Sequence, residues 1–544
     1  MTNSTPRADP VDVSAVEGTA RDSALLSAGT AVSRATGLLR VVVVGAVLGP
    51  TQLGNAFQVS NTLPNLVYYG FLAGSLIRAV VVPVLVRHLR AGDPEAVTRT
   101  SRAMLGLVSL ATLVAMPVLV LALPVLMGAV AQGPNTHEQV ELARVLVLFT
   151  APQVLLYAVA ATASAVMYAN RKFLLPALAP AAENVGVIVV LVLFAAVRSP
   201  GGHVGVGPLA LLGGGATLAV VGHAGVQWWG ASRCGVRLYP RRPRTDAEVV
   251  VLMRRALRVL GQAGLLALTM VVTLVAATRV IGGAVALQIA MNFYSLPVAL
   301  VATPIGLAVL PRLAALRDAG DERGFDRAVG ESLRLLVLVV LPASVGAVLL
   351  ARPLVHIVAV GSMGDAAGQA MTASAFAVLA VGLVGQSVTF VAGQACYAQG
   401  DATTPLVCMF VQAVVCVAVT AAALVFAHGP VLVPLVAGAY AVGSLVGGAL
   451  IIRAVLRGRR GVRREVLVTS LRACVASVAM LGPAALVLVL VGGAVPGRVG
   501  SLSVVLATSA AGAVGYIVVQ RLLRSPDLAL LRMRPGRPEQ VTVS

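Results

Sequence analysis

Residues 24–48 read ALLSAGTAVSRATGLLRVVVVGAVL, an apolar stretch in which only Arg34 and Arg40 are charged. About 20 apolar residues in a helix cover the ~30 Å hydrocarbon core of a bilayer, so this stretch is long enough to cross a membrane. The whole chain is 58% hydrophobic and only 11% charged, a balance that a soluble protein of 544 residues could not bury. Further stretches of this kind follow at 56–86, 103–130, 141–166, 173–197, 207–230, 257–279, 284–311, 331–358, 370–398, 405–427, 430–453, 466–492 and 500–523. We therefore predict an all-α polytopic membrane protein with about fourteen transmembrane helices.

The basic residues concentrate in alternate gaps between these segments. The gap between 207–230 and 257–279 is the richest in arginine, whereas 49–54 and 132–139 hold no Lys or Arg. The positive-inside rule places the arginine-rich gaps and both termini in the cytoplasm. The net charge of +20 is thus spread along a membrane surface, so we expect contacts with anionic lipids and no nucleic acid.

The sequence contains no recognisable enzyme or metal site. Its five cysteines lack CxxC spacing and its six histidines are scattered. No P-loop, HExxH or nucleophile–base set stands out. We expect no catalytic residue, metal or cofactor, and any active transport should be secondary.

An internal repeat divides the chain. The pattern of 168–176, Tyr-Ala-Asn followed by Pro, recurs in 397–405 with the same spacing, and Leu63-Pro64 recurs as Leu296-Pro297. Repeats separated by six spans keep one orientation, which predicts two pseudo-symmetric six-helix bundles around a central cavity, suited to alternating access. The expected organisation is a disordered cytoplasmic tail (1–22), an N-terminal bundle (23–230), a basic cytoplasmic linker (231–256), a C-terminal bundle (257–454), two last helices (455–523) and a cytoplasmic tail (524–544).

Ionisable residues inside spans are the candidate functional groups, because each costs ~2.5–3.5 kcal/mol or more in lipid. Arg34 lies about ten residues, or roughly 15 Å, into its segment, and Arg40 and Arg78 are also inside segments. Guanidinium groups suit phosphate oxygens, so these arginines predict an anionic substrate; the alternative is a structural arginine capped by carbonyls. Glu183 is either the charge partner of Arg34 or Arg40, or a site for a coupling ion.

A series of motifs then resembles one family, the MviN/MurJ lipid II flippases of the multidrug/oligosaccharidyl-lipid/polysaccharide exporter superfamily. The matching motifs, in order, are Ser33-Arg34-x-x-Gly37-x-x-Arg40, Asn55-Ala56-Phe57, Leu63-Pro64-Asn65-Leu66, Val82-Pro83-Val84-Leu85, Tyr168-Ala169 with Phe173-x-x-Pro176 and Pro180-x-x-x-Asn184, Leu310-Pro311-Arg312-Leu313, and Tyr397-Ala398 with Asp401-x-x-Thr404-Pro405.

The resemblance implies a flippase that moves lipid-linked peptidoglycan precursor across the bacterial cytoplasmic membrane, with cell-wall synthesis proteins as partners. It implies that Arg34 and Arg40 engage the diphosphate head group and that 455–523 hold the polyprenyl tail. We add Asn65 and Arg78 to the candidate substrate-binding residues.

The chain departs from the family pattern in its charges. Asn55 replaces a usual acid, Val67-Tyr68-Tyr69 replaces arginines, 71–75 lacks a glutamate, and 282–311 lacks an arginine. A less charged cavity keeps two alternatives open: an exporter of another lipid-linked glycan or of drugs, and a non-transporting scaffold for envelope synthesis.

Overall fold

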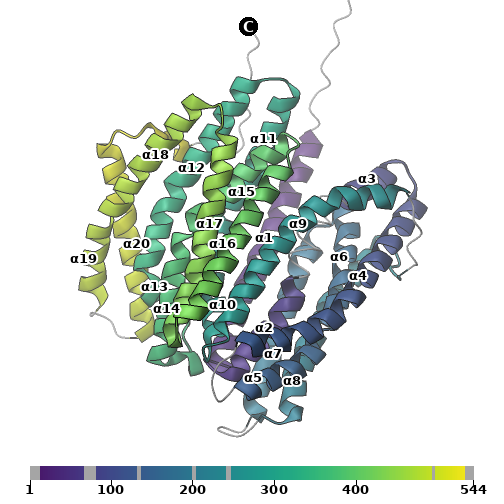
Figure 1. Ribbon diagram of the computed structural model, residues 1–544. Helices are drawn as coiled ribbons and strands as arrows, with labels where there is room; N and C mark the ends of the chain where they lie inside the picture. The colour runs from purple at the N-terminus through teal and green to yellow at the C-terminus, as the bar shows by residue number, and fades with distance from the viewer. Residues whose placement is uncertain are drawn as a thin grey trace, which may run out of the picture.

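The computed structural model describes residues 13–66, 81–130, 136–198, 204–240, 247–492 and 497–532. These residues form helices and no strand (Figure 1), so the predicted fold class is confirmed. In this part of the chain ten helices are long and apolar enough to cross a membrane, or eleven if one bent pair counts as a span. The count of about fourteen therefore stays a prediction.

The first group of helices packs around two apolar cores, one containing Tyr157 and the other Phe57 and Phe194. Its members are α1 (Val13–Val47), α2 (Gln52–Leu66), α3 (Val82–Arg90), α4 (Pro94–Val130), α5 (Thr136–Thr150), α6 (Gln153–Ala169), α7 (Leu174–Val197) and α8 (Val206–Arg233). Helix α7 packs on both α1 and α8 and so joins the first helix to the interior of the group.

The second group surrounds α15 and α17 and has one continuous apolar core. Its members are α9 (Ala247–Ala277), α10 (Gly283–Pro297), η2 (Val298–Ala302), α11 (Thr303–Asp318), α12 (Glu322–Leu349), α13 (Ala351–Val358), η3 (Gly361–Gly364), α14 (Ala366–Val381), α15 (Leu383–Ala398), α16 (Thr403–Phe426), η4 (Gly429–Val431) and α17 (Leu432–Val455). The last helices, α18 (Arg460–Ala479), α19 (Leu481–Gly492) and α20 (Gly497–Leu522), pack mainly on α12 and α13.

Several segments that the sequence predicts as single helices are broken. The segment 141–166 divides between α5 and α6 at Pro152, whose ring nitrogen cannot donate a helical hydrogen bond. The segment 284–311 passes through the π-turn η2 directly after Pro297. The segment 370–398 bends by 42° between α14 and α15. Breaks of this kind are tolerated where neighbouring helices satisfy the backbone.

Both predicted tails are partly folded. Residues 13–22, predicted to be disordered, are helical and form the first turns of α1, which starts at Val13. They can join the helix because extending an existing helix needs no new nucleation. After α20 the short helix η5 (Pro526–Arg532) carries Asp527, which is buried. Asp527 accepts hydrogen bonds from Arg334 at 3.1 Å and from Thr469 at 2.6 Å, so this part of the tail is fixed to α12 and α18. The linker 231–256 is likewise shortened, since α8 extends to Arg233 and α9 begins at Ala247.

The two groups contact each other at one end of the molecule. At this end, which is the lower end in Figure 1, α1 contacts α10 and η3, and α2 contacts α10. The ends of α3 and α11 that carry arginines lie at the opposite, upper end. The contact is close at Gly282, whose φ is 75° and whose absent Cβ would lie 2.2 Å from the Cα of Pro50. Only a glycine fits this approach without strain. We call this end the sealed end.

We predict that Gly385→Ala destabilises the second group. A Cβ at Gly385 would lie 2.3 Å from the carbonyl oxygen of Ser444 and 2.6 Å from the Cα of Leu445. Since both are backbone atoms, α15 and α17 must separate, at a cost of about 1–3 kcal/mol. The thermal unfolding midpoint of the purified protein in detergent should fall.

Gly393→Ala in the same helix is the matched control. Its new Cβ would approach no atom closer than the Tyr397 ring at 3.8 Å. The thermal unfolding midpoint of this variant should therefore equal that of the unsubstituted protein. Equal midpoints for the two variants would contradict the close α15–α17 approach.

Candidate functional site

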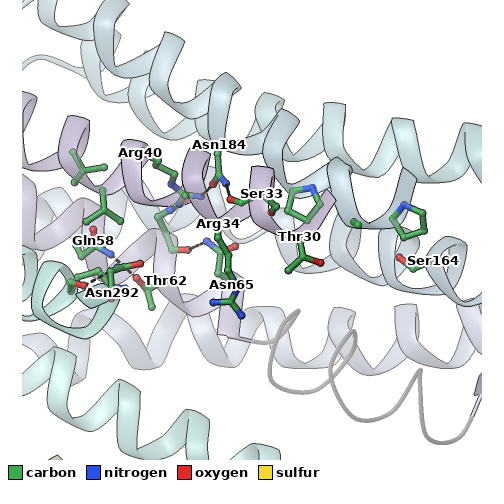
Figure 2. Close-up of a pocket in the computed structure, with 18 of the residues that line it drawn as sticks. Thr30, Ser33, Arg34, Arg40, Gln58, Thr62, Asn65, Ser164, Asn184 and Asn292 are labelled. Carbon is green, nitrogen blue, oxygen red and sulfur yellow. Dashed lines mark hydrogen bonds between the residues drawn. The ribbon is translucent and has the colours of Figure 1, made fainter. Parts of the chain in front are cut away.

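A cavity of about 550 Å³ lies between the two groups, bounded by α1, α2, α6 and α7 on one side and α10 on the other (Figure 2). Most of the residues that line it are polar or charged. The polar and charged lining residues are Thr30, Ser33, Arg34, Arg40, Gln58, Asn61, Thr62, Asn65, Ser164, Tyr168, Asn184, Gln288 and Asn292. No carboxylate belongs to the lining that the structure describes.

Arg34 and Arg40 both line this cavity although they lie on different faces of α1. Six residues correspond to about 120° around a helix, so the two side chains reach different walls. The Arg34 side chain is exposed, and within the described ranges no acceptor is hydrogen-bonded to its guanidinium group. It is therefore a cation in the cavity with its hydrogen-bond donors available.

Arg40 is instead held against α7. Its Nη1 lies 3.2 Å from Oε1 of Glu183 and 3.3 Å from Oδ1 of Asn184, and its side chain is 15% exposed. Asn184 also donates to the carbonyl of Ser33 at 3.2 Å and to the hydroxyl of Thr36 at 3.2 Å. These contacts fix the register between α1 and α7 and orient one arginine at the cavity wall.

Glu183 is the centre of a buried polar network. Besides Arg40, its Oε1 lies 2.9 Å from the hydroxyl of Tyr157, and its Oε2 lies 2.7 Å from Nδ1 of His223. The Tyr157 hydroxyl is also 2.5 Å from Oδ1 of Asn65 and shares its single proton between the two acceptors. Four helices, α1, α6, α7 and α8, thus meet at one carboxylate, and α2 joins the network through the contact of Asn65 with Tyr157. Of the two predicted charge partners, Arg40 is the one that pairs with Glu183.

His223 is the member of this network that the sequence analysis did not single out. It is fully buried in α8, and its Nε2 lies 3.5 Å from Nε2 of Gln227 one turn further on. The sequence does carry a signal for it, because His223, like Arg34 and Glu183, is an ionisable side chain inside an apolar segment.

The remaining predicted residues divide into two cases. Asn65 lines the cavity and joins the network through Tyr157. Arg78 lies outside the described residues. In the described ranges no group of three or more His, Cys, Asp or Glu side chains could hold a metal ion.

The sealed end depends on the amide of Asn55. Its Nδ2 donates to the carbonyl of Val280 at 2.8 Å, to that of Thr278 at 3.3 Å and to Gln139 at 3.1 Å. Its Oδ1 accepts from the backbone nitrogen of Ala284 at 2.9 Å. One buried side chain therefore joins α2 and α5 of the first group to the α9–α10 turn of the second.

We predict that Asn55→Asp opens the sealed end. An aspartate would place a second acceptor oxygen against the Thr278 and Val280 carbonyls, and a buried unpaired acceptor costs about 1–3 kcal/mol or more. The measurement is labelling of Val41→Cys, a cavity position, with a membrane-impermeant maleimide after the five native cysteines are replaced by alanine. With Asn55 in place, the cysteine at position 41 should be labelled from one side of the membrane only. In the Asn55→Asp variant it should be labelled from both sides.

Asn170→Asp is the control for the amide-to-acid change. Asn170 also donates to a carbonyl, that of Val166 at 2.8 Å, but at the far end of α6. Labelling from a single side in both variants would contradict a seal formed by Asn55.

The family model and the relatives that match this chain all carry the same family description. The model of the family described as "Lipid II flippase MurJ" matches residues 44–508. A probable lipid II flippase MurJ of Rhizobium tropici is 24% identical over 379 residues, which cover 69% of this chain and 70% of that protein. A lipid II flippase MurJ of Burkholderia cenocepacia is 25% identical over 387 residues, covering 70% of this chain and 73% of that protein.

Solved structures share the fold at low sequence identity. A lipid II flippase MurJ in an inward closed conformation superposes with a TM-score of 0.71 at 18% identity, over 92% of this chain and 99% of that one. An inward-facing multidrug resistance MATE family transporter of the MOP superfamily superposes with a TM-score of 0.61 at 15% identity, over 80% of this chain and 95% of that one. The helical arrangement described above is therefore the fold that these two structures share.

Proposed function

The chain belongs to the lipid II flippase MurJ family, and we propose that its cavity binds the diphosphate-bearing head group of lipid II during transfer between membrane leaflets. Membership of this family makes it a multi-pass membrane protein. The bacterial cytoplasmic membrane, with both termini on the cytoplasmic side, is the location that the distribution of arginines supports.

The observation that carries the proposal is the charge of the cavity. Arg34 offers its guanidinium group to the cavity, Arg40 stands at the wall, and no carboxylate lines the described cavity. Planar guanidinium groups bind phosphate oxygens in bidentate fashion. Asn65 and the other amide and hydroxyl side chains of the lining would donate to and accept from the sugar hydroxyls. Arg78 remains part of the proposed set of substrate-binding residues.

Transfer would proceed by alternating access of the two groups of helices. The groups are joined at the sealed end by Asn55 and Gly282, opposite the arginine-rich loops. A head group entering from the arginine-rich side would reach Arg34 and Arg40, and parting of the sealed end would release it on the other side. The bundles 23–230 and 257–454 are the moving bodies in this proposal.

The polyprenyl tail would stay in contact with lipid while the head group crosses. The last helices expose large apolar side chains, among them Leu471 and Val478 on α18 and Leu506 on α20. We assign the tail to the surface of residues 455–523.

Export of drugs is the second candidate, supported by the MATE-like fold. A shared fold does not select a substrate, whereas two arginines without a lining carboxylate favour an anion. Competition distinguishes the candidates: purified lipid II should displace a bound anionic prenyl diphosphate from the protein, and a drug exporter would show no such displacement.

We predict that Arg34→Ala abolishes rescue of a strain depleted of its own lipid II flippase, because the substitution removes the freely available cation in the cavity. Arg34→Lys should rescue partially, since it keeps the charge but loses the bidentate geometry. The measurement is growth on depletion, with immunoblotting of membranes to verify insertion of each variant.

Arg90→Ala supplies the control, because Arg90 is an exposed arginine in the last turn of α3 and lies outside the cavity lining. It should rescue growth fully. Full rescue by Arg34→Ala at normal membrane levels would refute the role of Arg34 in binding the head group.

A further inference from the structure

The end of α8 that carries Arg233 brings together both tryptophans of the chain and a group of cations. Helix α8 is long and apolar enough to cross a membrane. Trp228 and Trp229 lie in its last two turns, and their side chains are 49% and 52% exposed. Tryptophan is enriched at the level of the lipid head groups in membrane proteins. The end of α8 is therefore the place where this helix meets the head groups.

One exposed face of α8 leads along the helix to this end. Leu218, Gly222, Gly225, Trp229 and Arg233 follow one another at intervals of three or four residues, and all five are exposed. Residues at this spacing lie on the same face of a helix. A Cβ at Gly222 or Gly225 would meet no atom within 4 Å. The face is thus open and apolar up to Trp229 and positively charged at Arg233.

Residues 234–240 fold back against the end of α8 and place a second exposed arginine beside it. The carbonyl of Leu238, which is buried, accepts a hydrogen bond from the indole nitrogen of Trp228 at 3.2 Å. The carbonyl of Arg237 accepts one from Nε of Arg102 on α4 at 2.9 Å. These two contacts hold the backbone of the segment, while the side chain of Arg237 points out and is exposed.

Aromatic rings hold two of the guanidinium groups in place. The guanidinium carbon of Arg102 lies 3.7 Å from the centre of the Tyr239 ring, and that of Arg233 lies 5.0 Å from the centre of the Trp229 ring. A ring that covers the face of a guanidinium group leaves the N–H donors at its edge available. Since the side chains are already positioned, less conformational entropy is lost when they bind a ligand.

A lysine lies at the same end. Burial raises the pKa of the Cys234 thiol, and the charge of Lys172 acts on it in the opposite direction. None of the basic residues of this cluster forms an ion pair with a carboxylate that the structure describes. The cluster consists of Arg102, Lys172, Arg233 and Arg237. Four cations in one place repel one another, and a bound anion would relieve that repulsion.

We propose that the end of α8 is a binding site for an anionic phospholipid of the leaflet on the arginine-rich side of the membrane. The phosphate group accepts hydrogen bonds from Arg233 and Arg237, and Arg102 and Lys172 add positive charge. One acyl chain runs along the exposed face of α8, past Trp229. The bound lipid holds the start of the linker 231–256 at the membrane surface.

The apolar face decides between a phospholipid and a soluble phosphate. A soluble phosphate would contact the cations alone and leave the face from Leu218 to Trp229 uncovered. A phospholipid matches both parts, because its chains are apolar and its head group is charged. Each Lys or Arg near an anionic membrane surface strengthens the attraction by about fivefold, so a lipid with a net negative charge is preferred over a zwitterionic one.

The two tryptophans supply the measurement, because no other tryptophan occurs in the chain. The purified full chain is placed in nanodiscs of equal parts phosphatidylglycerol and phosphatidylcholine, with brominated acyl chains on one lipid or on the other. Bromine quenches tryptophan fluorescence only at short range, so the ratio of the two quenching strengths gives the lipid preference at this site. We expect brominated phosphatidylglycerol to quench about fivefold more strongly or better.

A pair of double variants separates this site from general surface charge. Arg233→Gln with Arg237→Gln should reduce the preference about fivefold or more. Arg323→Gln with Arg327→Gln is the matched control, because it removes two exposed arginines from α12, far along the chain, and leaves the same net charge. The control should keep the natural preference. The thermal unfolding midpoint verifies that both variants are folded.

Three outcomes would overturn the proposal. The first is equal quenching by the two brominated lipids in the natural chain. The second is an undiminished preference in the variant of Arg233 and Arg237, or an equal loss in the variant of Arg323 and Arg327. The third is loss of the preference when inorganic phosphate is added, which would assign the cations to a soluble anion. The measurement involves no lipid II, so these outcomes leave the proposed function of the cavity untouched.

Discussion

The contact between the Arg40 guanidinium group and the Glu183 carboxylate is the interaction on which the site depends. A charge inside a membrane protein must face water or a partner, and Arg40 does both, with one side at the cavity and the other at Glu183. The pair fixes α1 against α7 at the depth where the cavity lies. It also neutralises the Glu183 carboxylate, so the charge of Arg34 is left to the cavity. Removal of Glu183 would change the geometry of Arg40 and the charge of the site together.

The sealed end is built on a different principle, that of a neutral side chain that both donates and accepts. Asn55 occupies the position where the family resemblance leads one to expect an acid, and its amide matches two carbonyls and one backbone N–H. A carboxylate could not donate to the carbonyls. The lower charge of this chain thus has a structural counterpart at the sealed end, where closure relies on hydrogen bonds and close backbone approach.

Much of the fold followed from the sequence, because the length and apolarity of membrane helices are dictated by the bilayer. The exposure of Arg34 to a cavity and the pairing of Glu183 with an arginine followed from the cost of buried charge. The sequence could not show the breaks at Pro152 and Pro297, since proline kinks some membrane helices and leaves others continuous. Nor could it place Tyr157 beside Glu183, because residues on different helices are brought together by packing that no local pattern encodes.

The cost of the network argues for a role beyond stability. Replacing a buried ion pair with well-packed apolar side chains is often neutral or stabilising by about 1–4 kcal/mol, so a helix bundle has no structural need for Arg40, Glu183 and His223. Arg34 in addition leaves its donors open to the cavity, with no acceptor bonded to its guanidinium group among the described residues. Polar groups left incomplete in a membrane interior are costly to maintain. A non-transporting scaffold would be more stable without them, whereas a protein that binds and releases an anion across the membrane needs groups whose partners can change.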